Sequence, residues 1–102
     1  MKEIVLFCQY GASTGILADA MVKAAGEMDI EANINAYSEY DLDTVFASKH
    51  PDVILLGPQV RHKLKEFEAR YGDQVKILAI DPIDYGMANG KKVLEYALEN
   101  CR

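Results

Sequence analysis

The residues best suited to chemistry stand together between positions 8 and 15, in the order Cys-Gln-Tyr-Gly-Ala-Ser-Thr-Gly. An apolar run at 4–7 precedes them, and a helical pattern starts after them at Ile16. A segment that joins a strand to the start of a helix presents unpaired backbone amides, and the helix adds a partial positive charge. Amides that curve around one point bind an anion, typically phosphate. The segment 8–15 therefore predicts a phosphate-binding loop.

Cys8 stands at the entrance of this predicted loop, where it would act as a nucleophile. Gly11 and Gly15 let the backbone turn tightly and approach a ligand, and Ser13 and Thr14 add hydroxyl donors. The amides would stabilise a thiolate as they would a bound phosphate, so the pKa of Cys8 is expected below its ordinary value. The predicted chemistry is attack of the sulfur on phosphorus, with the transferred group held by the amides. It requires a sulfur that solvent and substrate can reach.

Two alternatives remain open at this point. Low-molecular-weight tyrosine phosphatases combine the same strand, loop and helix with an arginine at the position where this chain has Thr14. That arginine clamps phosphate and stabilises the transition state, so its loss favours transfer of a phosphoryl group over rapid hydrolysis. In the phosphatase alternative, Asp81 or Asp84 would be the general acid. In the other alternative, Cys8 is an idle thiol in an anion-binding module without catalysis.

Length and charge narrow the function further. A chain of 102 residues predicts one domain over 1–102. Its 11 basic and 16 acidic residues give a net charge of −5, which argues against nucleic-acid binding. Cys8 and Cys101 form no C-x-x-C pair and have no metal-ligand spacing with His50 or His62, so no metal and no cofactor is predicted. No apolar run suffices for a membrane span or a signal peptide, so the expected location is the cytoplasm.

Apolar runs and helical periodicity alternate along the chain, which predicts strands with helices between them. The predicted strands are 4–7, 31–37, 53–56 and 75–80. The predicted helices are 16–28, a short segment around 42–46, 60–71 and a last helix that Asn89 caps. A loop is expected over 81–88, after the fourth strand. Strands that alternate with helices in this way form a parallel sheet with helices on both faces.

The strand patterns also predict the order of the sheet. The runs 4–7 and 53–56 are apolar throughout and belong in the centre, whereas 31–37 alternates and suits an edge. With the fourth strand at the other edge, the order is 2-1-3-4, an open α/β sheet like that of the small phosphatases. Such sheets bind ligands at the carboxyl ends of their strands, where the order reverses. The loop at Cys8 and the turn 57–59 are predicted to meet there.

Three separated motifs resemble the IIB components of the lactose/cellobiose/chitobiose class of the bacterial phosphoenolpyruvate:sugar phosphotransferase system (PTS). The resemblance covers nearly the whole chain. The motifs are Ile4-Val5-Leu6-Phe7-Cys8 with Gly11, Ser13 and Thr14, then Val53 to Gln59, then Ile80-Asp81 with Tyr85-Gly86 and Asn89-Gly90. The resemblance implies a protein-phosphohistidine:sugar phosphotransferase. Its cysteine accepts a phosphoryl group from a phosphohistidine of the IIA component and passes it to a sugar held by the membrane-embedded IIC component.

The resemblance places the family's phosphate loop at 8–15. It implies that Cys8 is the catalytic residue and that the substrate-binding residues are Gln9, Tyr10, Gly11, Ala12, Ser13, Thr14 and Gly15. The family usually has small residues after the cysteine, so Gln9 and Tyr10 depart from its pattern, as do Ala12 and Gly15. The resemblance also implies that IIC selects the sugar and that this chain is not itself inserted in the membrane.

Residues elsewhere carry further expectations. Gln59 lies beside the predicted site and either contacts phosphate or caps the turn. Tyr10 either contacts the donor or covers the loop. Tyr85 and Gly86 are expected to shape the loop after the fourth strand and to pack against the cysteine loop. A basic cluster on the third predicted helix either attracts a phosphorylated partner or is a solvated helix face; its residues are Arg61, His62, Lys63 and Lys65. His62 is a rival phosphoryl carrier, but it lacks a predicted anion-binding loop.

Overall fold

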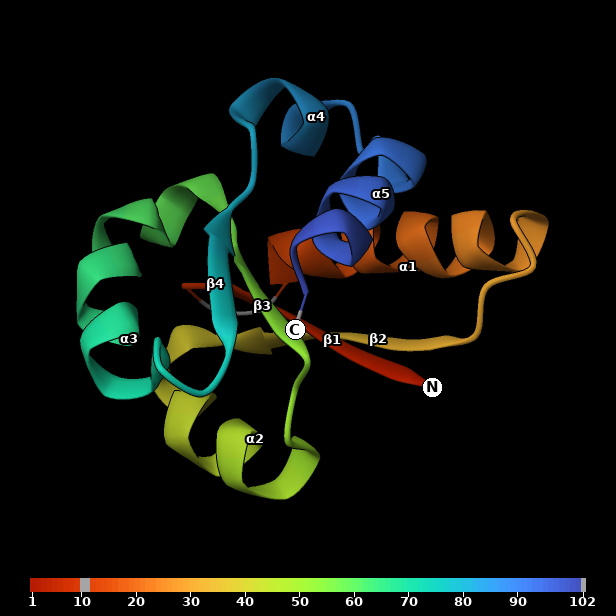
Figure 1. Cartoon of the computed structure of the whole chain (residues 1–102). Coiled ribbons are helices and arrows are strands. Elements are labelled where there is room, and N and C mark those ends of the chain that lie inside the picture. Colours follow the sequence, from red (N-terminus) through yellow and green to blue (C-terminus); the bar gives the residue numbers. More distant parts are fainter. Residues whose placement is uncertain (10–11, 102) are drawn as a thin grey trace.

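A computed structural model describes residues 1–9 and 12–101. Its centre is a four-stranded parallel sheet in the order β2-β1-β3-β4 (Figure 1). The strands are β1 (Lys2–Cys8), β2 (Ala32–Ser38), β3 (Val53–Leu56) and β4 (Lys76–Ala79). The predicted order 2-1-3-4 is confirmed, including the central place of the two strands that are buried on both faces.

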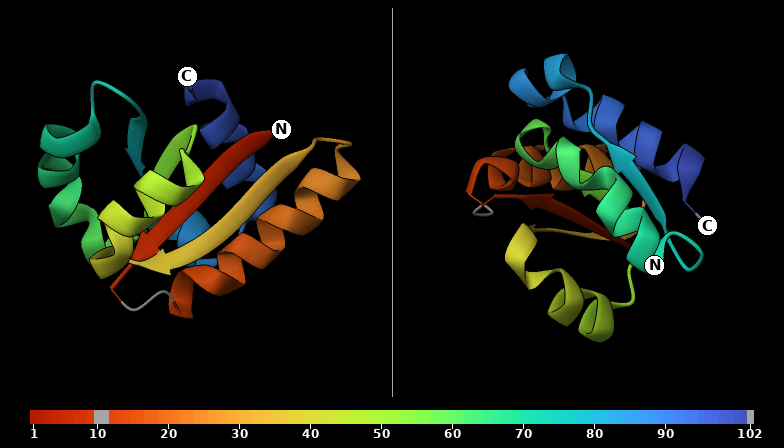
Figure 2. Two further views of the ribbon diagram at one scale, coloured as in Figure 1. Left: turned by 90° about the horizontal axis from the view of Figure 1, so that it is seen from below. Right: turned by 90° about the vertical axis from the view of Figure 1, so that its left-hand side faces the viewer.

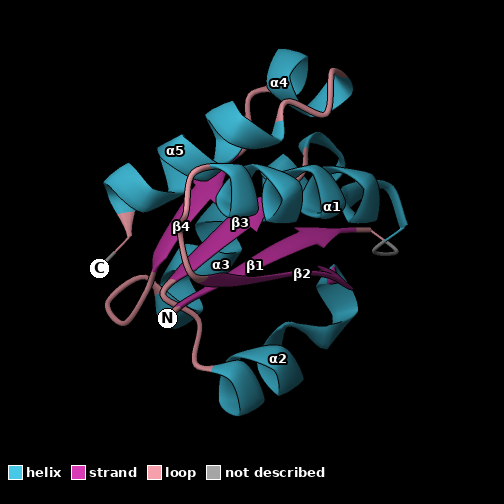
Figure 3. Ribbon diagram, turned by 90° about the vertical axis from the view of Figure 1, so that its right-hand side faces the viewer, coloured by secondary structure: helices cyan, strands magenta, loops and turns pink. Residues whose placement is uncertain are grey.

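Helices cover both faces of this sheet, as predicted (Figure 3). The longer helices are α1 (Ala12–Glu27), α2 (Leu42–Lys49), α3 (Leu64–Tyr71) and α5 (Gly90–Asn100). The short ones are the 3-10 helices η1 (Glu39–Asp41) and η2 (Pro58–Lys63) and the α-helix α4 (Pro82–Gly86). α1 and α5 lie on one face, and α2 and α3 lie on the other. Within 1–9 and 12–101, no helix has the length and apolar character that crossing a bilayer demands.

The side chains of β1 divide between two separate cores. Ile4 and Leu6 pack with α1 and α5, whereas Val5 and Phe7 pack with α2 and α3. All four are 0% exposed. Side chains alternate between the faces of a sheet along a strand. Cys8, the next residue after Phe7, therefore belongs to the face that α1 and α5 cover.

The segment 81–88, which the sequence predicts to be a loop, contains α4. Asp81 Oδ1 accepts hydrogen bonds from the backbone amides of Ile83 at 2.8 Å and Asp84 at 3.3 Å. Pro82 occupies the first turn, where a helix has no use for the missing amide hydrogen. A capping aspartate followed by proline is thus enough to start a helix of one turn.

α5 crosses α1 in direct backbone contact at Gly90. Asn89 caps α5, as predicted, because its Oδ1 accepts a hydrogen bond from the backbone amide of Lys92 at 3.2 Å. A Cβ on Gly90 would lie 2.3 Å from the carbonyl carbon of Ala20 and 2.6 Å from the amide nitrogen of Met21. The space between the two helices at this point therefore admits glycine only.

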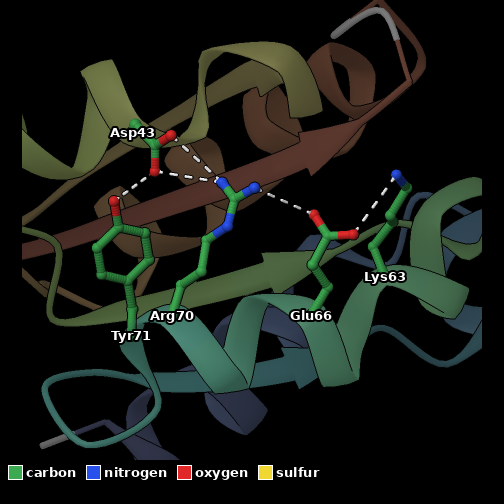
Figure 4. A network of polar contacts seen from close by, with 5 residues as sticks. All are labelled: Asp43, Lys63, Glu66, Arg70 and Tyr71. Carbon is green, nitrogen blue, oxygen red and sulfur yellow. Dashed lines mark hydrogen bonds and ion pairs between the residues drawn. The ribbon is translucent and has the colours of Figure 1, made fainter.

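A polar network joins α2 to α3 on the opposite face (Figure 4). The Nη1 atom of Arg70 lies 3.3 Å from both carboxylate oxygens of Asp43, and its Nη2 lies 3.5 Å from a carboxylate oxygen of Glu66. The Tyr71 hydroxyl donates a hydrogen bond to Asp43, and the Tyr71 ring stacks on Phe46. The hydrogen bond to Asp43, followed by partial burial, raises the pKa of Tyr71 above its ordinary value of 10.0.

The two ends of the described chain lie together at one edge of the molecule (Figure 2). β1 starts there with Lys2, and α5 returns to it after starting beyond the end of β4. The carboxyl ends of the strands, including that of β1, lie at the opposite edge, together with the start of α1.

Gly90→Ala is expected to lower the free energy of unfolding by about 3 kcal/mol, because a methyl group would collide with the backbone of α1. Gly26→Ala is the matched control, since a Cβ on that helical glycine would meet nothing within 4 Å. The control should gain about 0.5 kcal/mol from the better helix propensity of alanine. Urea unfolding measures the free energy of unfolding of both variants. Equal values for Gly90→Ala and Gly26→Ala would contradict the close crossing of α1 and α5.

Tyr71→Phe tests the network through pH. The folded-state pKa of Tyr71 is raised, so its hydrogen bond to Asp43 stabilises the fold below the unfolded-state pKa of about 10 and is lost as pH rises through the folded-state value. Wild type should therefore be more stable than Tyr71→Phe near pH 8, and the difference should shrink above pH 10. Urea midpoints of both proteins between pH 8 and 11 measure this. A difference that stays constant over that range would show that the hydrogen bond contributes nothing.

Candidate functional site

The candidate site is built around the end of β1, where Cys8 lies between β2 and β3. Cys8 pairs with Ser38, the last residue of β2. On the other side, Phe7 pairs with Leu56, and the amide of Gly57 donates a hydrogen bond to the Phe7 carbonyl at 2.9 Å. Cys8 and Gly57 are therefore neighbours across the two central strands, about 5 Å apart. This is the junction where the sheet order reverses, as the sequence predicts.

Gly57 marks a point at which four segments converge. A Cβ on this residue would lie 3.2 Å from Cγ2 of Thr14, 3.0 Å from Oε1 of Gln59 and 3.3 Å from Cε2 of Tyr85. These residues belong to α1, η2 and α4, which all adjoin the carboxyl ends of the strands. On β3, Val53 and Leu55 face α1 and α5, so the vacant position of Gly57 lies on the same face of the sheet as Cys8.

Cys8 is buried, with 2% of its surface exposed. The expectation of a sulfur that solvent can reach is therefore not met in this conformation. Thr14, at 0% exposed, is buried beside it in the first turns of α1. A reaction at Cys8 consequently requires the groups that cover it to move when a substrate or partner arrives.

The backbone just after Cys8 is fixed by a contact that sequence reasoning missed. The Ser38 hydroxyl donates a hydrogen bond to the carbonyl oxygen of Gln9 at 2.9 Å. Gln9 itself is exposed. The sequence did contain a signal for this contact. Ser38 directly follows the predicted edge strand 31–37, and the predicted order 2-1 places the end of that strand beside Cys8. Ser38 thereby holds Gln9, the second residue of the predicted loop, against the end of β2.

The remaining predicted loop residues divide into two groups. Tyr10 and Gly11 lie outside the described residues, as do the side chains of Ala12 and Ser13. α1 starts at Ala12 rather than at the predicted Ile16, so the segment 12–15 is helical. The tight turn expected at Gly15 is therefore absent, and a Cβ on Gly15 would meet nothing within 4 Å.

The first turn of α1 provides a positive electrostatic environment near Cys8. No acidic residue stands in this turn. The partial positive charge at the start of the helix is therefore not compensated by a carboxylate within its own first turn. An anion on the α1 side of Cys8 would benefit from this charge.

Tyr85 lies against the site, as the sequence predicts for the loop after the fourth strand. Gly86 follows it at the end of α4. Gln59 is exposed and places its amide oxygen beside Gly57. The two roles predicted for Gln59, contact with phosphate and capping of the turn, are both compatible with this position.

The two aspartates considered as general acids have structural roles beside a neighbouring cavity. Asp81 Oδ1 caps α4 by accepting the amide hydrogen bonds of Ile83 and Asp84. Asp84 Oδ1 lies 3.7 Å from Nζ of Lys92 on α5. Both aspartates line a cavity of 470 Å³, together with Arg61 of η2. His62, the rival carrier, is exposed on η2.

Two solved structures that share this architecture are IIB components of phosphotransferase systems. The lactose-specific IIB domain from Streptococcus pneumoniae superposes with a TM-score of 0.84 at 21% identity, over 99% of this chain and 98% of that one. The cellobiose-specific IIB component from Borrelia burgdorferi superposes with a TM-score of 0.77 at 37% identity, over 96% and 89%. The four-stranded parallel sheet in the order 2-1-3-4, with its helices, is thus the α/β fold of the PTS IIB structures.

Sequence comparison agrees with the fold. Residues 3–96 match the family described as PTS system, Lactose/Cellobiose specific IIB subunit. The galactose-specific EIIB component of Lactococcus lactis subsp. cremoris is 40% identical over 94% of this chain and 93% of its own length. The oligo-beta-mannoside-specific EIIB component of Bacillus subtilis is 36% identical over 96% and 94%. The chain belongs to the PTS lactose/cellobiose-specific IIB family, whose members are phosphoryl carriers in the enzyme II complex for sugar uptake.

Gly57→Ala is expected to disturb the site more than the fold. The new methyl group would press on Thr14, Gln59 and Tyr85, which must yield by a few tenths of an ångström, at a cost of about 1–2 kcal/mol in the free energy of unfolding. Backbone amide shifts in a ¹⁵N-¹H correlation spectrum should change most at Thr14 and Tyr85. The control Gly26→Ala should leave those two resonances in place, and unchanged resonances in both variants would contradict the convergence at Gly57.

Proposed function

We propose that the chain accepts a phosphoryl group on the Cys8 sulfur from a phosphohistidine of a IIA component and passes it to a sugar bound by a membrane-embedded IIC transporter. It would work on the cytoplasmic side of the membrane. The observation that carries this proposal is the position of Cys8: the end of a central strand, at the reversal of the sheet order, on the face where α1 begins.

The reaction on each side is an in-line displacement at phosphorus. The Cys8 thiolate attacks the phosphohistidine, the sulfur–phosphorus bond forms as the phosphorus–nitrogen bond breaks, and the imidazole leaves and takes up a proton. A sugar hydroxyl then attacks the phosphocysteine, loses its proton, and releases the thiolate. Positioning and electrostatic stabilisation by amides provide most of the catalysis in such a transfer. The start of α1, without an acidic residue in its first turn, supports this role.

Two features favour transfer over hydrolysis, the alternative of a tyrosine-phosphatase-type enzyme. Thr14 occupies the position at which those phosphatases have arginine, so no guanidinium from this position clamps the phosphate. Asp81 already accepts two backbone hydrogen bonds as the cap of α4, which makes it a poor general acid. A phosphocysteine protected from water is the more useful species for a carrier.

Exposed apolar side chains at the carboxyl edge support docking of a protein partner. Ile16 of α1 is 69% exposed, and Ile83 of α4 is 71% exposed. Met87 and Tyr40 are exposed to a similar degree, next to α4 and in η1. Contiguous exposed apolar surface marks protein interaction sites, and the elements that carry these four residues all follow the carboxyl ends of strands. Docking of the donor at this edge would also move the groups that bury Cys8.

The choice of sugar would lie with IIC. The relatives at 36–40% identity carry names with different specificities, galactose, cellobiose and oligo-beta-mannoside. Chains this similar over more than nine-tenths of their length have the same fold, so we expect them to use the same site for phosphoryl transfer. The identity of the sugar would therefore follow from the IIC partner rather than from this chain.

Cys8→Ser should abolish labelling by a ³²P-phosphorylated IIA component, because a serine hydroxyl is not ionised at neutral pH. Cys101→Ser is the matched control: Cys101 is the other cysteine, half-buried, and its sulfur hydrogen-bonds the Leu98 carbonyl at 3.5 Å. The control should be labelled like wild type, and iodine should release the label from both. Hydrolysis of p-nitrophenyl phosphate by the wild type should stay at background.

Full labelling of Cys8→Ser would overturn the carrier mechanism and direct attention to another residue, such as His62. Rapid release of inorganic phosphate from p-nitrophenyl phosphate would support the phosphatase alternative instead. An unlabelled wild-type chain would support a binding module with an idle thiol.

A further inference from the structure

Tyr85 carries a polar group that the fold itself does not use. The hydroxyl oxygen of Tyr85 is buried, and within 1–9 and 12–101 it has no hydrogen-bond partner. Buried hydroxyl groups are nearly always paired, because an unpaired one loses its bonds to water without compensation. An unpaired buried hydroxyl next to a reactive residue suggests a partner that arrives with the substrate.

The position of Tyr85 relates this hydroxyl to the end of β1. Cε2 of the ring, the atom next to the carbon that bears the hydroxyl, is 3.3 Å from the Cβ position of Gly57. Gly57 is the cross-strand neighbour of Cys8, and both face the side of α1 and α5. Tyr85 packs against the core on this same side. The ring edge therefore lies over the junction from which the Cys8 side chain projects.

The backbone around Tyr85 is held from both sides. The amide of Tyr85 donates a hydrogen bond to the Asp81 carbonyl at 2.9 Å, and the amide of Asn89 donates one to the Asp84 carbonyl at 2.9 Å. Asp84 also pairs with Lys92 of α5 at 3.7 Å. α4 is thus attached to the start of α5, which is in turn fixed on α1. A side chain carried by this helix has a defined position before any ligand binds.

We propose that the Tyr85 hydroxyl donates a hydrogen bond to a non-bridging oxygen of the phosphoryl group carried by Cys8. This inference rests on the proposed function and adds a phosphoryl-binding residue to it. The phenol stays protonated throughout and exchanges no atom with the substrate. It replaces, as a neutral donor, part of the stabilisation that an arginine at position 14 would give.

A neutral donor suits a carrier for a physical reason. A guanidinium binds a phosphoryl dianion strongly in both the ground state and the transition state, whereas a single phenol binds it more weakly. The phosphoryl group must leave Cys8 again for the sugar, so weak binding of the phosphocysteine prevents it from becoming a stable end product. The hydrogen bond still stabilises the charge on the oxygens as phosphorus moves between the two nucleophiles.

Tyr85→Phe tests the inference, with Tyr37→Phe as the matched control. Tyr37 lies on β2, and its ring packs against Phe7 in the core of the opposite face, with ring centroids 6.2 Å apart. Single-turnover phosphorylation by a phosphorylated IIA component should be about tenfold slower in Tyr85→Phe, as expected for loss of one hydrogen bond to a charged group. The ³¹P resonance of its phosphocysteine should move away from the wild-type position. Tyr37→Phe should match wild type in both readouts.

Stability separates this role from a structural one. Unphosphorylated Tyr85→Phe should unfold at a urea midpoint equal to or above that of wild type, because the removed hydroxyl has no partner to lose. A clearly lower midpoint would show that the hydroxyl bonds within the protein and would overturn the inference. Wild-type transfer rates and an unchanged ³¹P resonance in Tyr85→Phe would overturn it as well. Absence of phosphocysteine in the wild type itself would instead refute the proposed function.

Discussion

The alternation of side chains along β1 is the constraint on which the site depends. β1 lies between β2 and β3, and its residues from Ile4 to Phe7 are fully buried in two different cores. A shift of the strand by one residue would exchange the apolar contents of both cores, so the register is strongly fixed. The same register decides that Cys8, and not its neighbour Phe7, faces the start of α1. The packing of the two cores therefore also determines the direction of the Cys8 side chain.

The close approach of several segments at Gly57 is the second constraint on which the candidate site depends. Thr14, Gln59 and Tyr85 fill the space that any side chain at position 57 would need. The convergence brings hydroxyl and amide groups, all uncharged, to the neighbourhood of Cys8. An enzyme that hydrolyses phosphate esters benefits from a fixed cation here, while a relay must release its cargo. The uncharged set agrees with the family to which the chain belongs.

The sequence was sufficient for the sheet and for the meeting of the segments that follow β1 and β3, because both follow from strong local patterns. Continuous apolar runs at 4–7 and 53–56 indicate central strands, and the reversal of order then places Cys8 beside Gly57. The one-turn helix α4 was not predicted, since its signal is a cap and a proline rather than a periodic pattern. The bond from Ser38 to Gln9 and the burial of Cys8 were not predicted either. The bond and the burial depend on which side chains from distant segments meet in the fold. The spacing of residues within a single segment does not contain that information.

The placement of the two chain ends has a consequence for how the protein can be joined to others. The two ends of the described chain lie at the amino edge of the sheet (Figure 2), and Cys8, the last residue of β1, lies at the carboxyl edge. A fluorophore, an affinity handle or a neighbouring module attached by a tether at either terminus would project away from the carboxyl edge. Fusions of this kind should leave the carboxyl edge free for a docking partner, so the domain can be joined to a second domain without blocking this edge.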